Sequence, residues 1–168
     1  MQPKVYMAGF EVFQTDAVET GVRMKQLCKD YGFEGIFPLD KDITPQPDPL
    51  ETAKLIFDGN VKLVQKADII IANLNPFRGK EPDSGTVFEC GLGYGLGKKL
   101  YGFLSDNRAM AEKLLPETQA ATGLYEDGMR VENFGLPVNV MLSIPITIVE
   151  GTLEDALKQA REDLLQTR

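Results

Sequence analysis

The sequence predicts an α/β protein built on a parallel β-sheet with helices on both faces. Short apolar segments alternate with amphipathic segments along the chain, which is typical of repeated strand–helix units. Residues 67–74 (ADIIIANL) form a continuous apolar run, as expected for a strand covered on both sides. Five strands in 168 residues fit a doubly wound, flavodoxin-like five-stranded sheet, in a single domain spanning residues 1–168.

The strands are predicted from short apolar runs that end in small or turn-forming residues. The first strand ends in a small-residue loop, and the second is followed by a surface loop rich in Pro and Asp at 39–49. We expect the five strands at 4–10, 33–38, 67–74, 100–104 and 146–150.

Helices are predicted between these strands from apolar residues at helical spacing and from N-terminal capping residues. The first follows Asp16, which with Glu19 is predicted to form a capping box. The second begins after Asp48, with a proline at its first position, and runs to about residue 65. The others are expected at about 84–97, as one short helix early in the irregular segment 105–139, and at 152–166.

Composition excludes several classes of function. A net charge of −7 does not suit a nucleic-acid partner, and no apolar run is long enough to span a membrane. The chain has no histidine and two cysteines, so we expect no Ser-His or Cys-His catalysis, no metal site and no disulfide framework. We expect a cytoplasmic protein that needs no cofactor and whose acid–base chemistry comes from Asp, Glu, Lys, Tyr or Cys.

The stretch 83–97 (DSGTVFECGLGYGLG) combines carboxylates with closely spaced glycines. Its glycines lie inside the predicted helix, with the wrong spacing for a dinucleotide-binding loop. Gly85, Glu89, Gly93 and Gly97 share one helix face, which predicts that something packs closely against that face. Glu89 is therefore a single carboxylate on a face otherwise without side chains.

Glu89 and Asp83 are the candidate catalytic pair. Both lie near the carboxyl end of the third strand, where ligands bind in sheets of this type. Apolar neighbours such as Phe88 do not suit an exposed helix face, and the helix N-terminus is expected to keep Glu89 ionised, as a nucleophile requires. Asp83 could supply a proton, cap the helix, or do both. Two carboxylates at a sugar-binding crevice can cleave a glycosidic bond without a metal or cofactor.

Three blocks of this sequence resemble the nucleoside 2-deoxyribosyltransferase family. They are KVYMAGFEVF at 4–13, ADIIIANLNPFRGKEPDSGTVFECG at 67–91 and GLPVNVML at 135–142. The resemblance implies a flavodoxin-like fold and transfer of 2-deoxyribose between nucleobases with retention at C1′. It also implies 2′-deoxynucleosides and free purine or pyrimidine bases as partners.

The resemblance also assigns roles to individual residues. Glu89 would be the nucleophile that forms a covalent deoxyribosyl ester, Asp83 would protonate the base, and Tyr6 would orient the nucleophile. Phe13 would pack on the base. Asn139 would reach the sugar 5′-hydroxyl of a neighbouring subunit, with Met141 packing near the nucleophile there.

Three further residues are expected to line the substrate site. Gly85 belongs to the D-x-G-x-x-x-E motif, and Arg78 could order a loop over the base or be a surface charge. Asn60 stands where some family members carry an aspartate, so the preferred base could differ. The apolar segment 134–142 and the resemblance together predict a homo-oligomer with shared active sites.

Two other functions remain as alternatives. A hydrolase of 2′-deoxynucleoside 5′-monophosphates (an N-glycosidase) would need cationic or hydroxyl-rich phosphate contacts, and the segment 135–142 offers an amide and apolar groups instead. A non-catalytic nucleotide- or flavin-binding module would need a phosphate-binding loop, which the glycine spacing does not supply.

Overall fold

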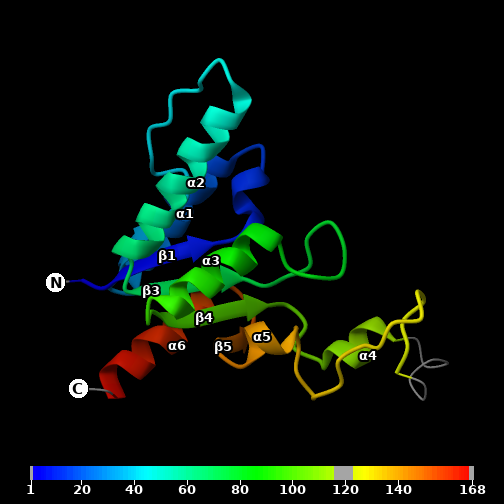
Figure 1. Ribbon diagram of the computed structural model, residues 1–168. Helices are drawn as coiled ribbons and strands as arrows, with labels where there is room; N and C mark the ends of the chain where they lie inside the picture. Colours follow the sequence, from blue (N-terminus) through cyan, green and yellow to red (C-terminus); the bar gives the residue numbers. More distant parts are fainter. Residues whose placement is uncertain (1, 116–122, 167–168) are drawn as a thin grey trace.

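The protein, described from a computed structural model over residues 2–115 and 123–166, contains one five-stranded parallel sheet (Figure 1). The strand order is β2-β1-β3-β4-β5, so the chain winds outward from β1 in both directions. This confirms the predicted doubly wound fold. The strands are β1 (Lys4–Ala8), β2 (Glu34–Ile36), β3 (Ile69–Asn73), β4 (Lys99–Leu104) and β5 (Thr147–Glu150).

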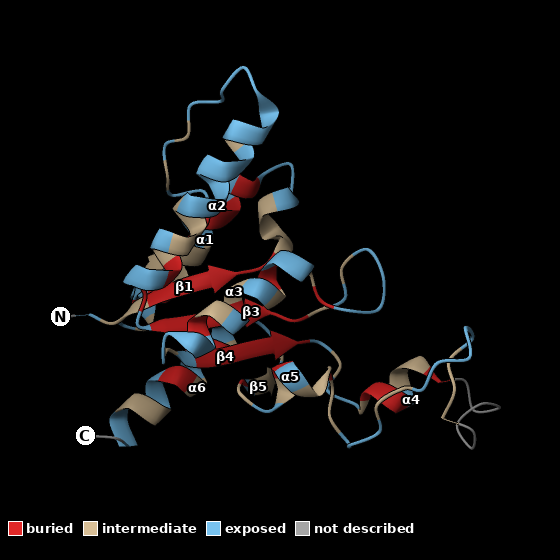
Figure 2. Cartoon of the chain, in the orientation of Figure 1, coloured by how far each residue is buried: buried red, intermediate tan, exposed pale blue. Residues whose placement is uncertain are grey.

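Helices cover both faces of the sheet. The helices are η1 (Phe10–Phe13), α1 (Ala17–Asp30), α2 (Pro49–Lys66), α3 (Ser84–Gly95), α4 (Met110–Leu114), α5 (Val140–Ser143) and α6 (Leu153–Gln166). Side chains from α2, α3 and α5 join one core cluster, and side chains from α1 and α6 join the other. The sheet is therefore the middle of three layers, and its central strands are buried (Figure 2).

Strand β1 contributes to both cores because alternate side chains point to opposite faces. Val5 and Met7 enter the core beneath α1 and α6, whereas Tyr6 enters the core beneath α2 and α3. All three are at most 1% exposed. The phenol oxygen of Tyr6 consequently needs a hydrogen-bond partner from the α2 and α3 layer.

Capping residues define most helix starts as the sequence predicts. Asp48 accepts a hydrogen bond from Leu50 N at the start of α2, and Asp155 accepts one from Thr152 N at the start of α6. The prediction for α1 is wrong. Asp16 makes no capping bond and instead accepts hydrogen bonds from Arg23 and Thr20, so its carboxylate is directed to side chains further along the helix.

The first half of α2 projects beyond the sheet and is exposed (Figures 1 and 2). Its apolar side chains Leu50, Leu55, Ile56 and Phe57 are 44–60% exposed. Among the described residues, no helix is both long enough and apolar enough to cross a lipid bilayer.

Candidate active site

Glu89 lies in the second turn of α3 and is held by two side chains from other elements. The Tyr6 hydroxyl, from β1, donates to Glu89 Oε1 at 2.6 Å. The Asn60 side-chain amide, from α2, donates to the same oxygen at 3.3 Å. These contacts join three of the residues that the sequence singles out, from segments far apart in the chain.

Both donors contact Oε1, and this leaves the two carboxylate oxygens in different surroundings. Within the part of the chain that the structure describes, Oε2 has no hydrogen-bond partner. An oxygen that is to attack carbon needs a free lone pair, and the other oxygen can meanwhile be held in place. The geometry thus orients Glu89 without blocking the oxygen that could react.

The pKa of Glu89 is raised from its ordinary value of 4.5 to about 7. Burial is the largest cause, because it penalises the charged form, and the nearby Asp83 adds to the increase. The Tyr6 hydrogen bond and the Lys41 charge act in the opposite direction. The helix N-terminus was expected to keep this carboxyl ionised, but burial raises its pKa and favours the protonated form.

Tyr6 remains a hydroxyl donor. Its pKa is raised far above the ordinary value by burial, and the negative charge of Glu89 raises it further. A protonated phenol can donate to a carboxylate, whereas a phenolate cannot. Tyr6 can therefore orient Glu89 and stabilise its charge.

Lys41 is a site residue that sequence reasoning missed. It follows β2, and its Nζ donates to the carbonyl oxygen of Pro38 at 2.8 Å and to Oδ1 of Asn60. A weak signal in the sequence is Gly59, an unexpected glycine inside α2, over which the Lys41 side chain lies. Lys41 brings a positive charge near Glu89.

Asp83 is the N-cap of α3. Its Oδ2 accepts hydrogen bonds from Thr86 N at 2.9 Å and from Thr86 Oγ1 at 3.2 Å. No hydrogen bond is found at Oδ1 within the described residues, so capping leaves one oxygen for proton exchange. A side chain at Gly85 would approach Asp83 Oδ2 at 3.1 Å, so this glycine leaves space beside the carboxylate.

The glycine-rich face of α3 is only partly as predicted. Gly93 allows close packing, since a Cβ there would lie 2.7 Å from Ile70 and 3.1 Å from Leu100. Gly97 lies beyond the helix with φ of 69° and has no close neighbour. Phe88 was expected to be covered, but it is 54% exposed and packs beside Phe57 of α2.

Phe13 and Arg78 belong to an aromatic cluster that joins the loops after β1 and β3. The Phe77 ring stacks on Phe10 at 5.1 Å and on Phe13 at 5.3 Å. The Arg78 guanidinium lies over both Phe77 and Phe13. This arrangement supports the loop-ordering alternative for Arg78, and the Phe13 ring is in contact with both Phe77 and Arg78. Neither residue lines the cavity beside Glu89.

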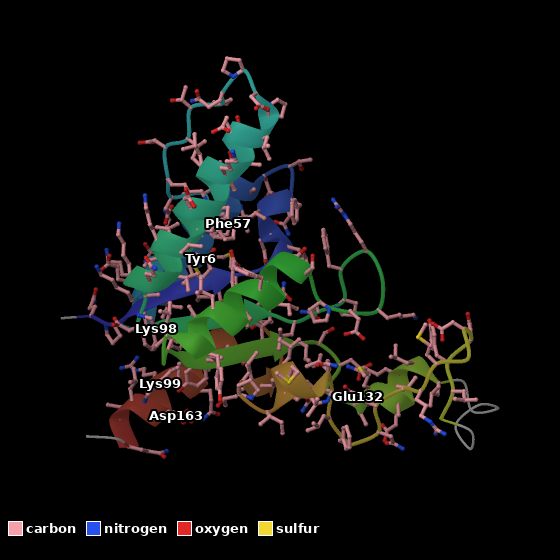
Figure 3. The ribbon with its side chains drawn as sticks, viewed as in Figure 1. Tyr6, Phe57, Lys98, Lys99, Glu132 and Asp163 are labelled. Carbon is pink, nitrogen blue, oxygen red and sulfur yellow. The ribbon has the colours of Figure 1, made fainter. Side chains whose placement is uncertain are left out.

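Asn139 and Met141 lie away from Glu89 in the same chain. Asn139 donates to Glu132 at 2.8 Å, and its Oδ1 accepts from Met141 N at the start of α5. Figure 3 shows Glu132 far along the molecule from Tyr6, the residue that contacts Glu89. Met141 is 78% exposed. A single chain therefore does not bring these two residues to the nucleophile.

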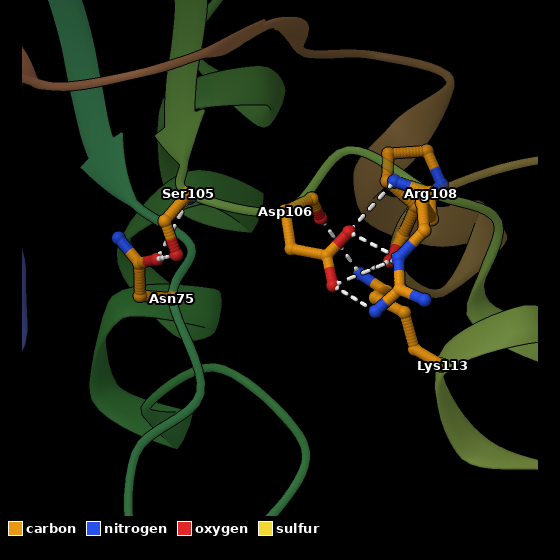
Figure 4. A network of polar contacts seen from close by, with 6 residues as sticks. Asn75, Ser105, Asp106, Arg108 and Lys113 are labelled. Atoms are coloured by element: carbon orange, nitrogen blue, oxygen red, sulfur yellow. Dashed lines mark hydrogen bonds and ion pairs between the residues drawn. The ribbon is translucent and has the colours of Figure 1, made fainter.

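A polar network fixes the loops after β3 and β4 (Figure 4). Asn75 Oδ1 accepts from both the backbone and the hydroxyl of Ser105. Asp106 pairs with Arg108, and Lys113 donates to the Asp106 carbonyl oxygen. The Asn75–Ser105 bonds join the two loops, and the Asp106 contacts are local to the segment after β4.

Two of the cavities in the described part of the chain are lined by α3. The cavity that contains Glu89 and Asn60 has a volume of about 210 Å³. A larger apolar cavity of about 720 Å³ is lined by residues of α3 and α5, including Asn139 and Met141, and does not contain Glu89. Volume alone would favour the larger cavity as a binding site, but the reactive carboxylate lies in the smaller one.

A model of the nucleoside 2-deoxyribosyltransferase family matches residues 5–141. The chain belongs to this family. A solved 2-desoxiribosyltransferase from Leishmania mexicana is 37% identical, with a TM-score of 0.78, and the match covers 95% of this chain and 97% of that one.

Two other proteins are similar over most of their length. An uncharacterized protein of Schizosaccharomyces pombe, C191.05c, is 32% identical over 186 residues, covering 96% of this chain and 88% of the relative. A conserved protein from Enterococcus faecalis V583 is 19% identical with a TM-score of 0.62, over 97% of this chain and 99% of that one, and shows the fold alone. Family membership supports a pentosyltransferase activity for this chain.

Proposed function

We propose that this family member is a nucleoside 2-deoxyribosyltransferase that works through a covalent ester on Glu89. The observation that carries the proposal is the arrangement at Glu89, where Tyr6 and Asn60 both bind Oε1 and Oε2 is left to react. Membership in the family supports deoxynucleosides and free bases as substrates.

In the first half-reaction, Glu89 Oε2 attacks C1′ of the deoxynucleoside and the C1′–N bond breaks. The base departs with the bonding electron pair and takes a proton from Asp83 Oδ1. In the second half-reaction, a nitrogen of the incoming base attacks C1′, the ester bond breaks, and the acceptor proton passes to Asp83. Glu89 is regenerated as a carboxylate, and two inversions give net retention.

We also propose a homo-oligomer in which Asn139 and Met141 complete the site of a neighbouring subunit. The cavity at Glu89 is about 210 Å³, below the roughly 300–1,000 Å³ of usual ligand pockets. Met141 and Ile144 are 78% and 71% exposed, which is unfavourable for apolar side chains unless another surface covers them. Asn139 in a single chain lies with Glu132 rather than with Glu89.

The activity is tested by incubating the protein with a 2′-deoxynucleoside and a different free base, and following all four species by chromatography. Transfer predicts a new deoxynucleoside in equal amount to the released base. Release of the base with free 2-deoxyribose alone would show hydrolysis of the nucleoside and would contradict transfer. Without an acceptor, mass spectrometry should find a deoxyribosyl adduct on the peptide that contains Glu89, and the Glu89→Ala variant should lack it.

The shared site is tested by mixing two inactive variants, Glu89→Ala and Asn139→Ala, under conditions that exchange subunits. Mixed assemblies would contain some sites with both residues intact, so activity should reappear. Exchange without recovered activity, or an active monomer in sedimentation, would rule out the shared site.

A further inference from the structure

Lys41 is held in a defined position on the Glu89 side of the sheet. It follows a tight turn in which Asp40 Oδ2 accepts from Phe37 N at 2.9 Å, and Lys25 of α1 pairs with Asp40. The side chain then crosses α2 at Gly59, where an added Cβ would lie 2.5 Å from Lys41 Cδ and 3.0 Å from Cε. A glycine inside a helix is unfavourable, and here its absent side chain leaves the space that the lysine occupies.

The ammonium group of Lys41 determines how the Asn60 amide faces. Lys41 can only donate hydrogen bonds, so the atom of Asn60 that it contacts must be the carbonyl oxygen Oδ1. The amide nitrogen is consequently directed to Glu89 Oε1. The reverse orientation would place an NH₂ group against the ammonium and a carbonyl oxygen against the carboxylate, and both contacts would be repulsive.

The charge of Lys41 also acts on Glu89. The titratable groups that face Glu89 in the described part of the chain are Tyr6 from β1, Asp83 and Cys90 from the α3 region, and Lys41 from the loop after β2. Lys41 is the cation among them. Its charge favours the ionised carboxylate, while burial and Asp83 favour the protonated form.

We propose that Lys41 is a positioning residue for the nucleophile, which orients the Asn60 amide toward Glu89 and keeps the Glu89 carboxylate in its attacking form. This inference rests on the proposed function for its catalytic consequence. The contact between Lys41, Asn60 and Glu89 can nevertheless be tested in the resting protein, without any turnover.

Two substitutions remove the effect by different routes. Lys41→Met keeps most of the side-chain volume and removes the charge. Gly59→Ala keeps the lysine residue but pushes its side-chain methylene groups away from α2. Alanine is a stronger helix former than glycine, so the substitution should not weaken the helix. Lys41→Arg keeps a positive charge and should restore most of the function. Lys62→Met on the exposed side of α2 and Gly95→Ala, which meets no neighbour, are matched controls.

The direct measurement is the pKa of Glu89 in protein labelled with ¹³C at the glutamate carboxyl carbons, its signal identified by its loss in Glu89→Gln. Lys41→Met should raise this pKa by about one unit, the lower end of the effect of a nearby opposite charge, and Gly59→Ala, which displaces the charge without removing it, should raise it by less. Lys41→Arg and both controls should stay within about 0.3 units of the wild type, since they keep the charge or lie away from it.

In the transfer assay, Lys41→Met should lose about tenfold in kcat/KM at pH 6 and Gly59→Ala a smaller amount, and both losses should be at most a few-fold at pH 9, where the carboxylate is ionised in all variants. Their unfolding midpoints should match those of the controls. An unchanged Glu89 pKa in Lys41→Met would overturn the proposal, as would a loss of activity that follows only the loss of folded protein. If the wild type shows no transfer, the proposed function fails, but the carboxyl titration still decides the role of Lys41.

Discussion

The two faces of the sheet use the same strands for different purposes. Beneath α1 and α6, Val5 and Met7 of β1 pack with Cys28, Ile71 and Leu157 in a sealed apolar core. Beneath α2 and α3, Tyr6 of the same strand places a hydroxyl against a half-buried carboxylate. The first face contributes mainly stability, whereas the second holds a charge that is unfavourable to bury.

The difference shows how a reactive group can be kept within a stable fold. Burial raises the pKa of Glu89 to about 7, which means that its ionised form is destabilised by the protein. The Tyr6 hydroxyl, the Asn60 amide and the Lys41 charge each offset part of that cost. Substitutions at the Glu89 site should therefore lower activity more than stability, and substitutions in the opposite core should lower stability more than activity.

The largest difference between the effect on activity and the effect on stability is expected for Glu89→Gln. Transfer should fall by at least about a thousandfold, because a neutral amide cannot replace the nucleophile. The stability contribution of the raised pKa is fully present below about pH 4.5 and is lost as pH rises through 7, since the folded state holds the proton more tightly. At pH 8 the variant should thus be more stable than wild type, by up to about 3 kcal/mol.

This prediction is checked by urea unfolding of both proteins at pH 4.5 and pH 8. The two should have similar stability at the lower pH and differ at the higher one. A variant that is less stable than wild type at pH 8 would mean that the carboxylate is not destabilised by burial.

The opposite face should behave in the opposite way. Leu157 of α6 is fully buried among apolar side chains, so Leu157→Ala should destabilise the protein by about 2–5 kcal/mol. Activity per folded molecule should be unchanged, because no polar group of the Glu89 site lies on this face. Unfolding curves and a rate normalised to the folded fraction test this, and a large loss of normalised rate would contradict the separation of the two faces.

Asp83→Asn should reduce the rate without reducing stability. Asparagine caps a helix about as well as aspartate, so the unfolding free energy should change by less than about 0.5 kcal/mol. The rate should fall about a hundredfold if Asp83 exchanges the base proton. Since the charge of Asp83 raises the pKa of Glu89, the acid limb of the pH–rate profile should move to lower pH. A limb that moves to higher pH would exclude this coupling.

The smallest expected effect compares two buried tyrosines. Tyr6→Phe removes the hydrogen bond that lowers the pKa of Glu89, so the acid limb should move to higher pH by about one unit and the rate at pH 7 should fall about fivefold. Tyr101→Phe is the matched control, because its hydroxyl donates to Asp163 on the α6 side. Equal shifts in both variants would indicate a general packing effect instead of a specific contact.

Local patterns in the sequence were sufficient to predict much of the fold. The apolar run at 67–74 became β3, and Asp48 caps the helix that it was expected to begin. These features depend on neighbouring residues, so spacing along the chain reveals them. Asp16 failed as a cap because Arg23 and Thr20 compete for its carboxylate, a choice that propensity does not determine.

The sequence by itself determined that a carboxylate pair, six residues apart, would lie at the start of α3 near the carboxyl end of a buried strand. Only the tertiary structure decided the chemical state of Glu89. Tyr6 meets Glu89 across 83 residues, and Lys41 reaches Asn60 across 19, through packing that no local pattern encodes. Burial then raises the pKa of Glu89 to about 7, because desolvation depends on everything that surrounds a group and not on its neighbours in the chain.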